Sequence, residues 1–319
     1  MKKKIVIVAG EPNSINSEII FKSWSKISKN LKKRIYIISN YNLLSDQLKK
    51  LKCKIKLVKV SSIYNKPKKN YLKVLDVSIN YKNPFMISKK ETEKYVKRSL
   101  SIAHNLAIQR EIQGFINCPV NKEIFKKAKI GVTEYLAKKC NVKDGSEAML
   151  IHNKKLSVSP ITIHIDVKQI SNSLNPKIIE KKIQTINLYY RKIMKKKPKI
   201  GVLGLNPHNA EFRKNSEEKR IIFPSILKLK KRGMNIRGPL VSDTIFMNDY
   251  KNFDVIVGMY HDQVLSPFKT LFKFDAINIT LGLDYIRVSP DHGTARNLVG
   301  KNKANPSSLL KCIDFLAKN

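Results

Sequence analysis

Short apolar runs rich in β-branched residues alternate along the chain with longer stretches whose apolar positions recur at helical spacing. The apolar runs predict strands at 4–9, 34–39, 54–60, 115–118, 156–163, 200–205, 253–258, 275–280 and 284–288. Amphipathic stretches predict helices at 15–31, 90–113, 133–140, 176–195, 219–232 and 306–317. Strands that alternate with helices are typical of a mainly parallel sheet covered by helices, so the sequence predicts an α/β protein.

Three histidines come directly after predicted strands. His164 ends the run Ser159-Pro-Ile-Thr-Ile-His164, His208 lies in Leu205-Asn-Pro-His208, and His261 follows Phe253-Asp-Val-Ile-Val-Gly258. Ligands of α/β proteins usually bind at the edge where parallel strands end. A single histidine at such a place is more often a capping or hydrogen-bonding residue. Three at equivalent positions favour a shared divalent ion, because three protein ligands leave a position open for substrate.

Further polar residues fall near these histidines. Asp262 adjoins His261 and Asp243 lies in the segment 238–244, and we take both as candidate acid–base groups. Lys269 and Arg287 are candidates for holding an anion, Arg as a planar fork and Lys as a point charge. Taken singly, Asp243 also suits a turn and Lys269 also suits a solvated surface. By contrast, His104 in a helix and His152 in a polar turn are expected to be structural or exposed.

The segment Ser289-Pro-Asp-His-Gly-Thr-Ala-Arg-Asn297 predicts a turn that opens a short helix. Backbone N–H groups in such a turn can bind phosphate or the polar groups of adenosine. The twelve glycines form no GxGxxG, so a Rossmann fingerprint is absent and any nucleotide must bind in another way.

Composition narrows the possible classes. The net charge is +39, but only 10 of the 63 basic residues are Arg, and Lys is spread over the whole chain. Nucleic-acid sites usually concentrate Arg and aromatic residues on one patch, so we expect no nucleic-acid partner. The four cysteines form no CxxC pair, which indicates a reduced cytoplasmic chain. No apolar run approaches the roughly 18 residues of a membrane span, and the run after Met1 is too short for a signal peptide.

Several motifs together resemble one known family. They are Gly204-Leu-Asn-Pro-His208, Gly238-Pro-Leu-Val-Ser-Asp-Thr244, Met259-Tyr-His-Asp-Gln263, Asn278-Ile-Thr-Leu-Gly-Leu283 and Arg287-Val-Ser-Pro-Asp-His-Gly-Thr-Ala295. In this order they resemble the 4-hydroxythreonine-4-phosphate dehydrogenases of pyridoxine and pyridoxal 5′-phosphate biosynthesis. The resemblance extends from Gly10-Glu-Pro12 to the C-terminus and is most specific in the second half.

The resemblance implies a fold and a reaction. The expected fold is that of isocitrate and isopropylmalate dehydrogenases, with two α/β/α domains and an interdomain active-site cleft. We place one domain at 1–130 plus 271–319 and the other, with the metal ligands and dimer contacts, at 131–270. The family oxidises the secondary hydroxyl of its phosphorylated substrate with NAD or NADP, and the resulting β-keto acid loses CO2. A homodimer is expected.

The resemblance also implies roles for particular residues. The metal, expected to be Zn, Mg or Co, would be held by His164, His208 and His261. Substrate-contacting positions of the family match Lys269, Asn278 and Arg287, and Thr133 matches a position at the phosphate end. A similar His-Gly loop holds the adenosine end of the cofactor in the wider fold family, and the matching residues here are His292, Gly293, Thr294, Ala295 and Asn297.

The chain also departs from the family pattern. Val132 replaces a histidine that contacts the substrate, and Asn297 replaces a common aspartate. The loops at 10–18 and 209–216 lack the usual glycines. These changes leave open a sister dehydrogenase that acts on a threonate or erythronate phosphate. A metal hydrolase or a non-catalytic binding protein with the same histidines is a third possibility, although no HExxH motif supports it.

Overall fold

The computed structural model describes residues 4–65, 67, 71–121, 123–125, 131–142 and 145–319. The chain forms two compact units, and the first combines both ends of the sequence. It contains Met1–Leu136 and Asp284–Asn319, and the second unit is the continuous segment Ala137–Leu283. Among the described residues, no helix combines the length and apolarity that crossing a membrane requires.

The first unit is built on a parallel sheet with the strand order β3-β4-β2-β1-β5-β12. Its strands are β1 (Ile5–Val8), β2 (Ile35–Ser39), β3 (Leu57–Val60), β4 (Leu72–Asp76), β5 (Gly114–Asn117) and β12 (Ile286–Pro290). All residues of β1, β2 and β5 are buried, as expected for strands covered by helices on both faces.

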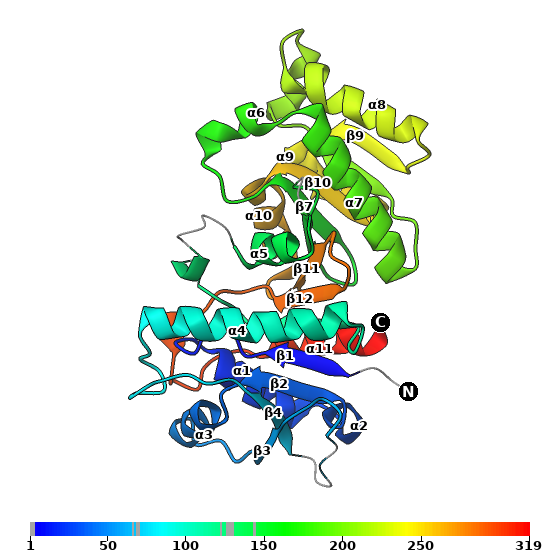
Figure 1. The fold of residues 1–319 in the computed structure, drawn as a ribbon. Helices are drawn as coiled ribbons and strands as arrows, with labels where there is room; N and C mark the ends of the chain where they lie inside the picture. Colours follow the sequence, from blue (N-terminus) through cyan, green and yellow to red (C-terminus); the bar gives the residue numbers. More distant parts are fainter. Residues whose placement is uncertain (1–3, 66, 68–70, 122, 126–130, 143–144) are drawn as a thin grey trace. The chain divides into compact units, whose positions relative to one another are not determined.

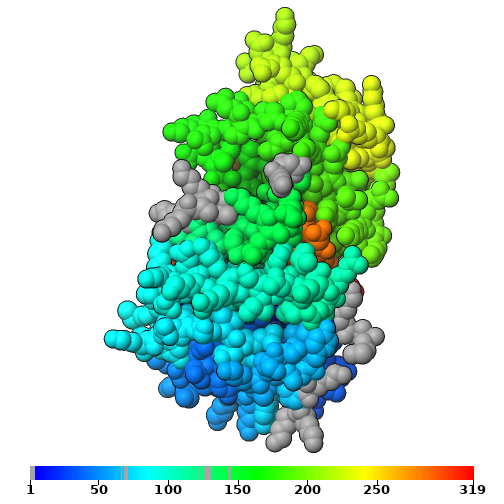
Figure 2. Space-filling model, in the orientation of Figure 1, coloured from blue at the N-terminus to red at the C-terminus, as the bar shows by residue number. Residues whose placement is uncertain are grey.

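The helices of the first unit are α1 (Asn16–Lys26), α2 (Lys29–Lys32), α3 (Tyr41–Lys50), α4 (Lys89–Ile108) and α11 (Ser307–Lys318), and α5 (Val132–Lys139) begins at its end. The longest of them, α4, buries residues spaced three or four apart, among them Thr92, Tyr95 and Val96, against β1, β2 and β5. Its outer side chains are part of the surface shown in cyan in Figure 2. Ser88 caps α4 by accepting a hydrogen bond from the Glu91 amide.

The second unit has the strand order β11-β6-β7-β10-β8-β9. Its strands are β6 (Ala148–His152), β7 (Ser157–Thr162), β8 (Ile200–Leu203), β9 (Ile236–Leu240), β10 (Val255–Tyr260) and β11 (Ile277–Leu281). Four neighbouring strands, β7, β10, β8 and β9, run parallel, whereas β6 is antiparallel to β7 and to β11. The helices are α6 (Ile170–Ser173), α7 (Pro176–Met194), α8 (Phe223–Lys231), α9 (Ser242–Ile245) and α10 (His261–Phe272) (Figure 1).

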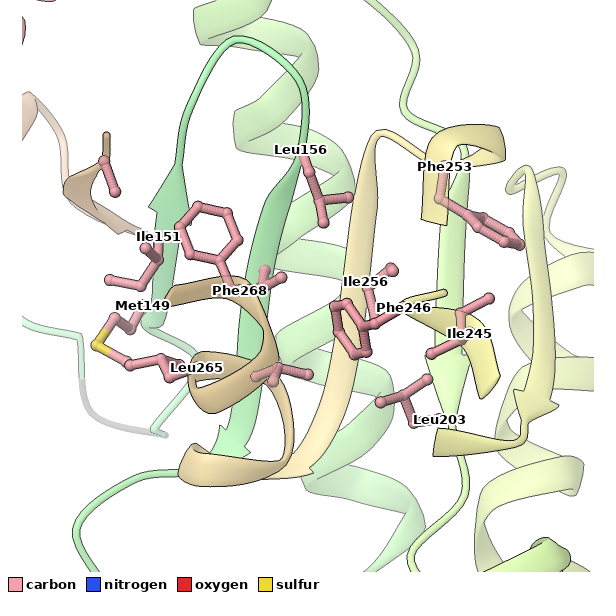
Figure 3. Close-up of a cluster of buried hydrophobic side chains, with 13 residues drawn as sticks. Met149, Ile151, Leu156, Leu203, Ile245, Phe246, Phe253, Ile256, Leu265 and Phe268 are labelled. Carbon is pink, nitrogen blue, oxygen red and sulfur yellow. The ribbon is translucent and has the colours of Figure 1, made fainter. Parts of the chain in front are cut away.

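A hydrophobic core in the second unit fixes α10 on the sheet. Leu265 and Phe268 of α10 point toward the strands, and Ile256 of β10 and Leu156, just before β7, belong to the same buried cluster (Figure 3). Phe268 is fully buried, and burial of a side chain of this size stabilises the fold by roughly 1.5–3 kcal/mol. This packing positions the first turn of α10, which begins with His261.

Each predicted strand overlaps an observed one, so the predicted alternation of strands and helices is confirmed. The single helix predicted at 15–31 is wrong, because the chain leaves helical geometry at Ile27 and Ser28 then caps the separate α2. The predicted elements did not include α3, α6, α9, α10, β4, β6 or β9.

Candidate functional site

The three histidines follow adjacent parallel strands of the second unit. His164 comes two residues after β7, His261 is the first residue of α10 directly after β10, and His208 lies in the turn after β8. These strands are neighbours in the order β7-β10-β8 and run in the same direction. Their carboxyl ends therefore meet at one edge of the sheet, the place where parallel α/β sheets bind ligands.

His164 and His261 lie close together. Their ring centroids are 5.7 Å apart. The Nδ1 atom of His261 is 2.5 Å from Oδ1 of Asp262, whose side chain is 76% exposed. A carboxylate on one ring nitrogen fixes the orientation of an imidazole and leaves its other nitrogen to bind a ligand, as in many metal sites.

His208 begins a turn of unusual backbone geometry. Residues 208–212 all have positive φ, between 48° and 56°, although none of them is glycine. Such left-handed geometry costs an L-residue roughly 1–2 kcal/mol, so the surrounding contacts must hold it in place. The preceding residues are held by the buried carboxylate of Glu218, which accepts hydrogen bonds of 2.8 Å from the amides of Leu205 and Asn206.

Within the part of the chain that the structure describes, no three His, Cys, Asp or Glu side chains form a group that could hold a metal ion. The structure thus places His164 close to His261, and among the described residues His208 does not complete a group of three ligands with them. The donor set nevertheless fits a divalent ion in its chemistry, because two imidazoles are neighbours and a carboxylate orients one of them.

The two candidate acid–base residues are both solvent-exposed. Asp243 is the second residue of α9, and Asp262 is the second residue of α10. Each lies at the start of a helix that follows a strand of the parallel part of the sheet, so both residues lie at the same carboxyl edge of the sheet as the histidines.

Arg287 lies inside the first unit, on β12, with 3% of its surface exposed. Its Nε donates to Oδ1 of Asn117 at the end of β5, and its Nη1 donates to Oγ1 of Thr133 at 3.4 Å. Burial lowers the pKa of Arg287 to about 10, so the guanidinium stays charged at neutral pH. The structure therefore brings together two of the predicted substrate residues, Arg287 and Thr133.

The other two predicted substrate residues belong to the second unit. Lys269 lies exposed in the last turn of α10. Asn278 lies on β11, and its Oδ1 is buried with no hydrogen-bond partner among the described residues. An unsatisfied buried acceptor is costly, so this oxygen suits the N–H or O–H of a ligand.

The turn at residues 292–295 follows β12. Gly293 is exposed, and a Cβ at this position would meet no described atom within 4 Å. Ala295 has left-handed backbone geometry, with φ 45°, and Asn297 is exposed in the short helix Arg296–Leu298. The carbonyl of Thr294 accepts a hydrogen bond from the amide of Ile15, which ties this turn to the loop after β1.

A cavity of about 670 Å³ lies in the first unit beside that loop. This volume is within the range of small-molecule sites. Its lining includes Glu11, Asn13, Ser88, Thr92 and Arg296. Glu11 is 2% exposed and pairs with the Arg296 guanidinium at 3.2 Å. The buried Thr92 hydroxyl has no hydrogen-bond partner among the described residues.

The sequence prediction did not include Glu11 or Arg296. A signal for Glu11 is present, since Gly10-Glu11-Pro12 follows the first strand directly. Gly10 has φ 73°, and a Cβ there would lie 2.6 Å from the carbonyl oxygen of Cys118. The tight turn that places Glu11 in the cavity wall therefore requires glycine.

Known proteins are similar to this chain in sequence and in fold. The sequence profile of the family described as "Pyridoxal phosphate biosynthetic protein PdxA" matches residues 30–316. The chain belongs to the PdxA family. Proteins named 4-hydroxythreonine-4-phosphate dehydrogenase from Sulfurihydrogenibium sp. (strain YO3AOP1) and Aquifex aeolicus (strain VF5) are 35% and 37% identical to it. The alignments cover 98% and 99% of this chain and 97% and 98% of those proteins.

Other relatives carry a second name or show the fold. The D-threonate 4-phosphate dehydrogenase of Salmonella typhimurium is 30% identical over 96% of each chain. The crystal structure of the 4-hydroxythreonine-4-phosphate dehydrogenase from Klebsiella pneumoniae has a TM-score of 0.85, with 29% identity over 99% of each chain. Isocitrate dehydrogenase from Methylococcus capsulatus has a TM-score of 0.50 at 12% identity, covering 99% of this chain and 85% of its own. The predicted membership of the PdxA family and the predicted fold are confirmed.

Proposed function

We propose that the protein oxidises 4-phosphooxy-L-threonine (4-hydroxythreonine 4-phosphate) with NAD or NADP. The product is a β-keto acid that loses CO2 to give 3-amino-2-oxopropyl phosphate. The observation that carries the proposal is the placement of three histidines after adjacent strands in a PdxA-family chain. The names of the full-length relatives support the substrate, and we place the reaction in the cytoplasm as a step of pyridoxal 5′-phosphate biosynthesis.

His164, His208 and His261 would hold one divalent ion, Zn, Mg or Co. When bound, such an ion would act as a Lewis acid toward the secondary hydroxyl group of the substrate. His261 enters this role already oriented by Asp262. His208, in the turn after β8, would be the third ligand.

The nicotinamide cofactor would bind in the first unit, at the turn 292–295 and in the cavity beside the loop after β1. Bound NAD or NADP supplies the hydride acceptor. Exposed backbone at Gly293 gives polar groups of the cofactor access to the turn, and Asn297 is exposed next to it. The buried hydroxyl of Thr92 and the capped start of α4 offer further polar contacts in the cavity.

Four side chains would bind the substrate. Arg287 and Lys269 would hold its anionic groups, and Thr133 would lie at the phosphate end. Asn117 orients the Arg287 guanidinium through Nε, and Nη1 of the same guanidinium donates to Thr133. The unsatisfied oxygen of Asn278 would accept a hydrogen bond from the substrate hydroxyl or amine. Asp243 or Asp262 would take up the hydroxyl proton.

A D-threonate 4-phosphate dehydrogenase is the second candidate. Val132, the first residue of α5, stands where the family has a histidine, and several relatives bear this name. We propose a homodimer in either case, following the family.

A substrate panel tests the proposal. Purified protein is assayed with 4-hydroxythreonine phosphate and with threonate phosphate, each with NAD and with NADP and an added divalent ion. We expect the higher kcat/KM on 4-hydroxythreonine phosphate. A clear preference for threonate phosphate would show that this compound is the substrate instead. If neither NAD nor NADP is reduced, the proposed dehydrogenase activity is refuted.

Metal binding is tested separately. Replacing His164, His208 or His261 by Ala should lower metal content and activity together, and His104→Gln should change neither. His104 is a suitable control because it is a buried histidine bonded to the Tyr285 hydroxyl at 2.9 Å. Full metal occupancy in the His208→Ala protein would disprove its role as a ligand.

A further inference from the structure

Gln263 connects three segments of the second unit through one buried side chain. It is the third residue of α10 and is 9% exposed. Its Oε1 accepts a hydrogen bond of 2.6 Å from the amide of Met259 in β10. Its Nε2 donates to the carbonyl of Gly204 at 2.6 Å and to Oγ of Ser242 at 2.8 Å.

Each partner of Gln263 lies just before a residue of the candidate site. Met259 is two residues before His261, Gly204 is four residues before His208, and Ser242 directly precedes Asp243. These partners belong to the end of β10, the end of β8 and the start of α9. One amide group thus fixes the spacing of three segments that are distant in the sequence.

The neighbouring glycine makes room for this side chain. A Cβ at Gly258 would lie 2.9 Å from Oε1 of Gln263 and 2.6 Å from Cγ1 of Val264. Any larger residue at 258 would push the start of α10 away from β10. Gly204 shows the same requirement, because a Cβ there would lie 2.1 Å from Oδ1 of Asn209.

A simple helix cap would require only part of this arrangement. A Gln or Glu at the third position of a helix commonly reaches back to a backbone N–H before the helix, and the bond to Met259 is of this kind. Either residue type supplies that acceptor. Only Gln also supplies two N–H donors, and here both are used, on Gly204 and on Ser242.

We propose that Gln263 is a positioning residue that holds the segments carrying His208, Asp243 and His261 in the register needed to bind a divalent ion. This inference rests on the proposed function. On the other side of the same segment, Glu218 holds the amides of Leu205 and Asn206. The residues from Gly204 to Asn206, which lead to His208, are therefore held by two buried side chains, Gln263 and Glu218.

The decisive variant is Gln263→Glu, studied at about pH 8, well above the ordinary pKa of a glutamate. It keeps the shape and the acceptor for Met259, and it removes the two donors. We expect Co²⁺ binding to the metal-free protein, measured by calorimetry, to weaken about 10- to 100-fold, the usual effect of losing a group that orients metal ligands. We also expect faster hydrogen–deuterium exchange in residues 204–212.

Gln47→Glu is the matched control. Gln47 is also buried and donates to two backbone carbonyls, those of Pro12 and Pro84, but it lies in the first unit. It should leave Co²⁺ affinity and exchange at 204–212 unchanged. Ser242→Ala provides a milder second variant, which removes one acceptor and should shift both readouts in the same direction by less.

The two readouts separate this proposal from the proposed function. Unchanged Co²⁺ affinity together with unchanged exchange at 204–212 in Gln263→Glu would overturn the role of Gln263. If the wild-type protein binds no divalent ion, the metal site of the proposed function fails and with it the role assigned to Gln263 in ion binding. Faster exchange alone would then show only that Gln263 stabilises the backbone of residues 204–212.

Discussion

Burial of a single imidazole makes the stability of this protein depend on pH. His152 ends β6, and its Nδ1 is 2.8 Å from Oγ of Ser157 on the neighbouring strand. Burial lowers the pKa of His152 from 6.5 to about 4, because the charged ring is poorly solvated there. The unfolded chain therefore binds the proton more tightly than the folded chain. The stabilisation is complete above pH 6.5 and is lost as the pH falls toward 4.

We predict that acidification from about pH 7 to about pH 5 lowers the free energy of unfolding by roughly 2 kcal/mol through His152 alone. The measurement is urea unfolding of the wild type and of His152→Gln at both pH values. The variant should lose less stability on acidification than the wild type by about that amount. Equal losses in the two proteins would show that His152 does not titrate on unfolding.

Val132 offers a second test at the level of one residue. An imidazole at this position could donate a hydrogen bond to an anionic substrate, and such a bond is worth roughly 1.5–3 kcal/mol, or about 10- to 150-fold in transition-state binding. The loops at 10–18 and 209–216 changed as well, so we expect that other contacts have compensated. Val132→His should therefore raise kcat/KM for 4-hydroxythreonine phosphate by less than about tenfold.

A gain above about a hundredfold would contradict this expectation. Combined with a higher wild-type activity on another acid phosphate, it would show that the natural substrate is different.

Helix α7 illustrates how local sequence signals build an element. Asn175 caps it by accepting a hydrogen bond of 3.0 Å from the Ile178 amide, and Pro176 is its first residue. Removing such a cap usually costs about 1 kcal/mol. We predict that Asn175→Ala lowers the stability of the second unit by this amount in urea unfolding, and that Asn175→Asp, which keeps the acceptor, restores most of it. No loss in the Ala variant would mean that solvent replaces the cap.

The predicted strands were those with clear apolar runs, and some elements with an interrupted pattern were not predictable. β4 was missed because Lys73 lies in its buried run. The Lys73 ammonium donates to the carbonyls of Lys32 and Lys33 and lies 4.6 Å from the Tyr36 ring centre, contacts that no local pattern reveals. Burial lowers the pKa of Lys73 to about 8. Similarly, α10 begins with His-Asp and contains Pro267, so its sequence does not resemble a helix.

The candidate site was predictable only in part. The positions of His164, His208 and His261 after strands followed from the apolar runs, and the adjacency of their strands is a property of the sheet order. The left-handed backbone at 208–212 was not predictable, since five consecutive non-glycine residues rarely adopt positive φ. The ion pair of Glu11 with Arg296 and the hydrogen bonds of Gln263 emerge only from tertiary contacts.

At the scale of the whole molecule, the excess of 63 basic over 24 acidic residues exceeds what ion pairing can neutralise. Lys59, Lys196 and Lys228 pair with carboxylates, but their side chains are 55–64% exposed, so these pairs contribute little stability.

We predict that duplex DNA binds only weakly and that modest added salt abolishes binding, as counterion release requires. Fluorescence anisotropy over a salt series measures this. Sequence-selective binding that resists salt would contradict this prediction and would show that the positive charge serves to bind DNA.

The order of the segments in the two units has a consequence for synthesis on the ribosome. The second unit is continuous, whereas the first needs β12 and α11 from the end of the sequence. Domains fold as units while the chain emerges. The second unit can therefore fold while β5, which later pairs with β12, still has an open edge. Nascent chains that stall near residue 283 would expose this edge, a common starting point for aggregation.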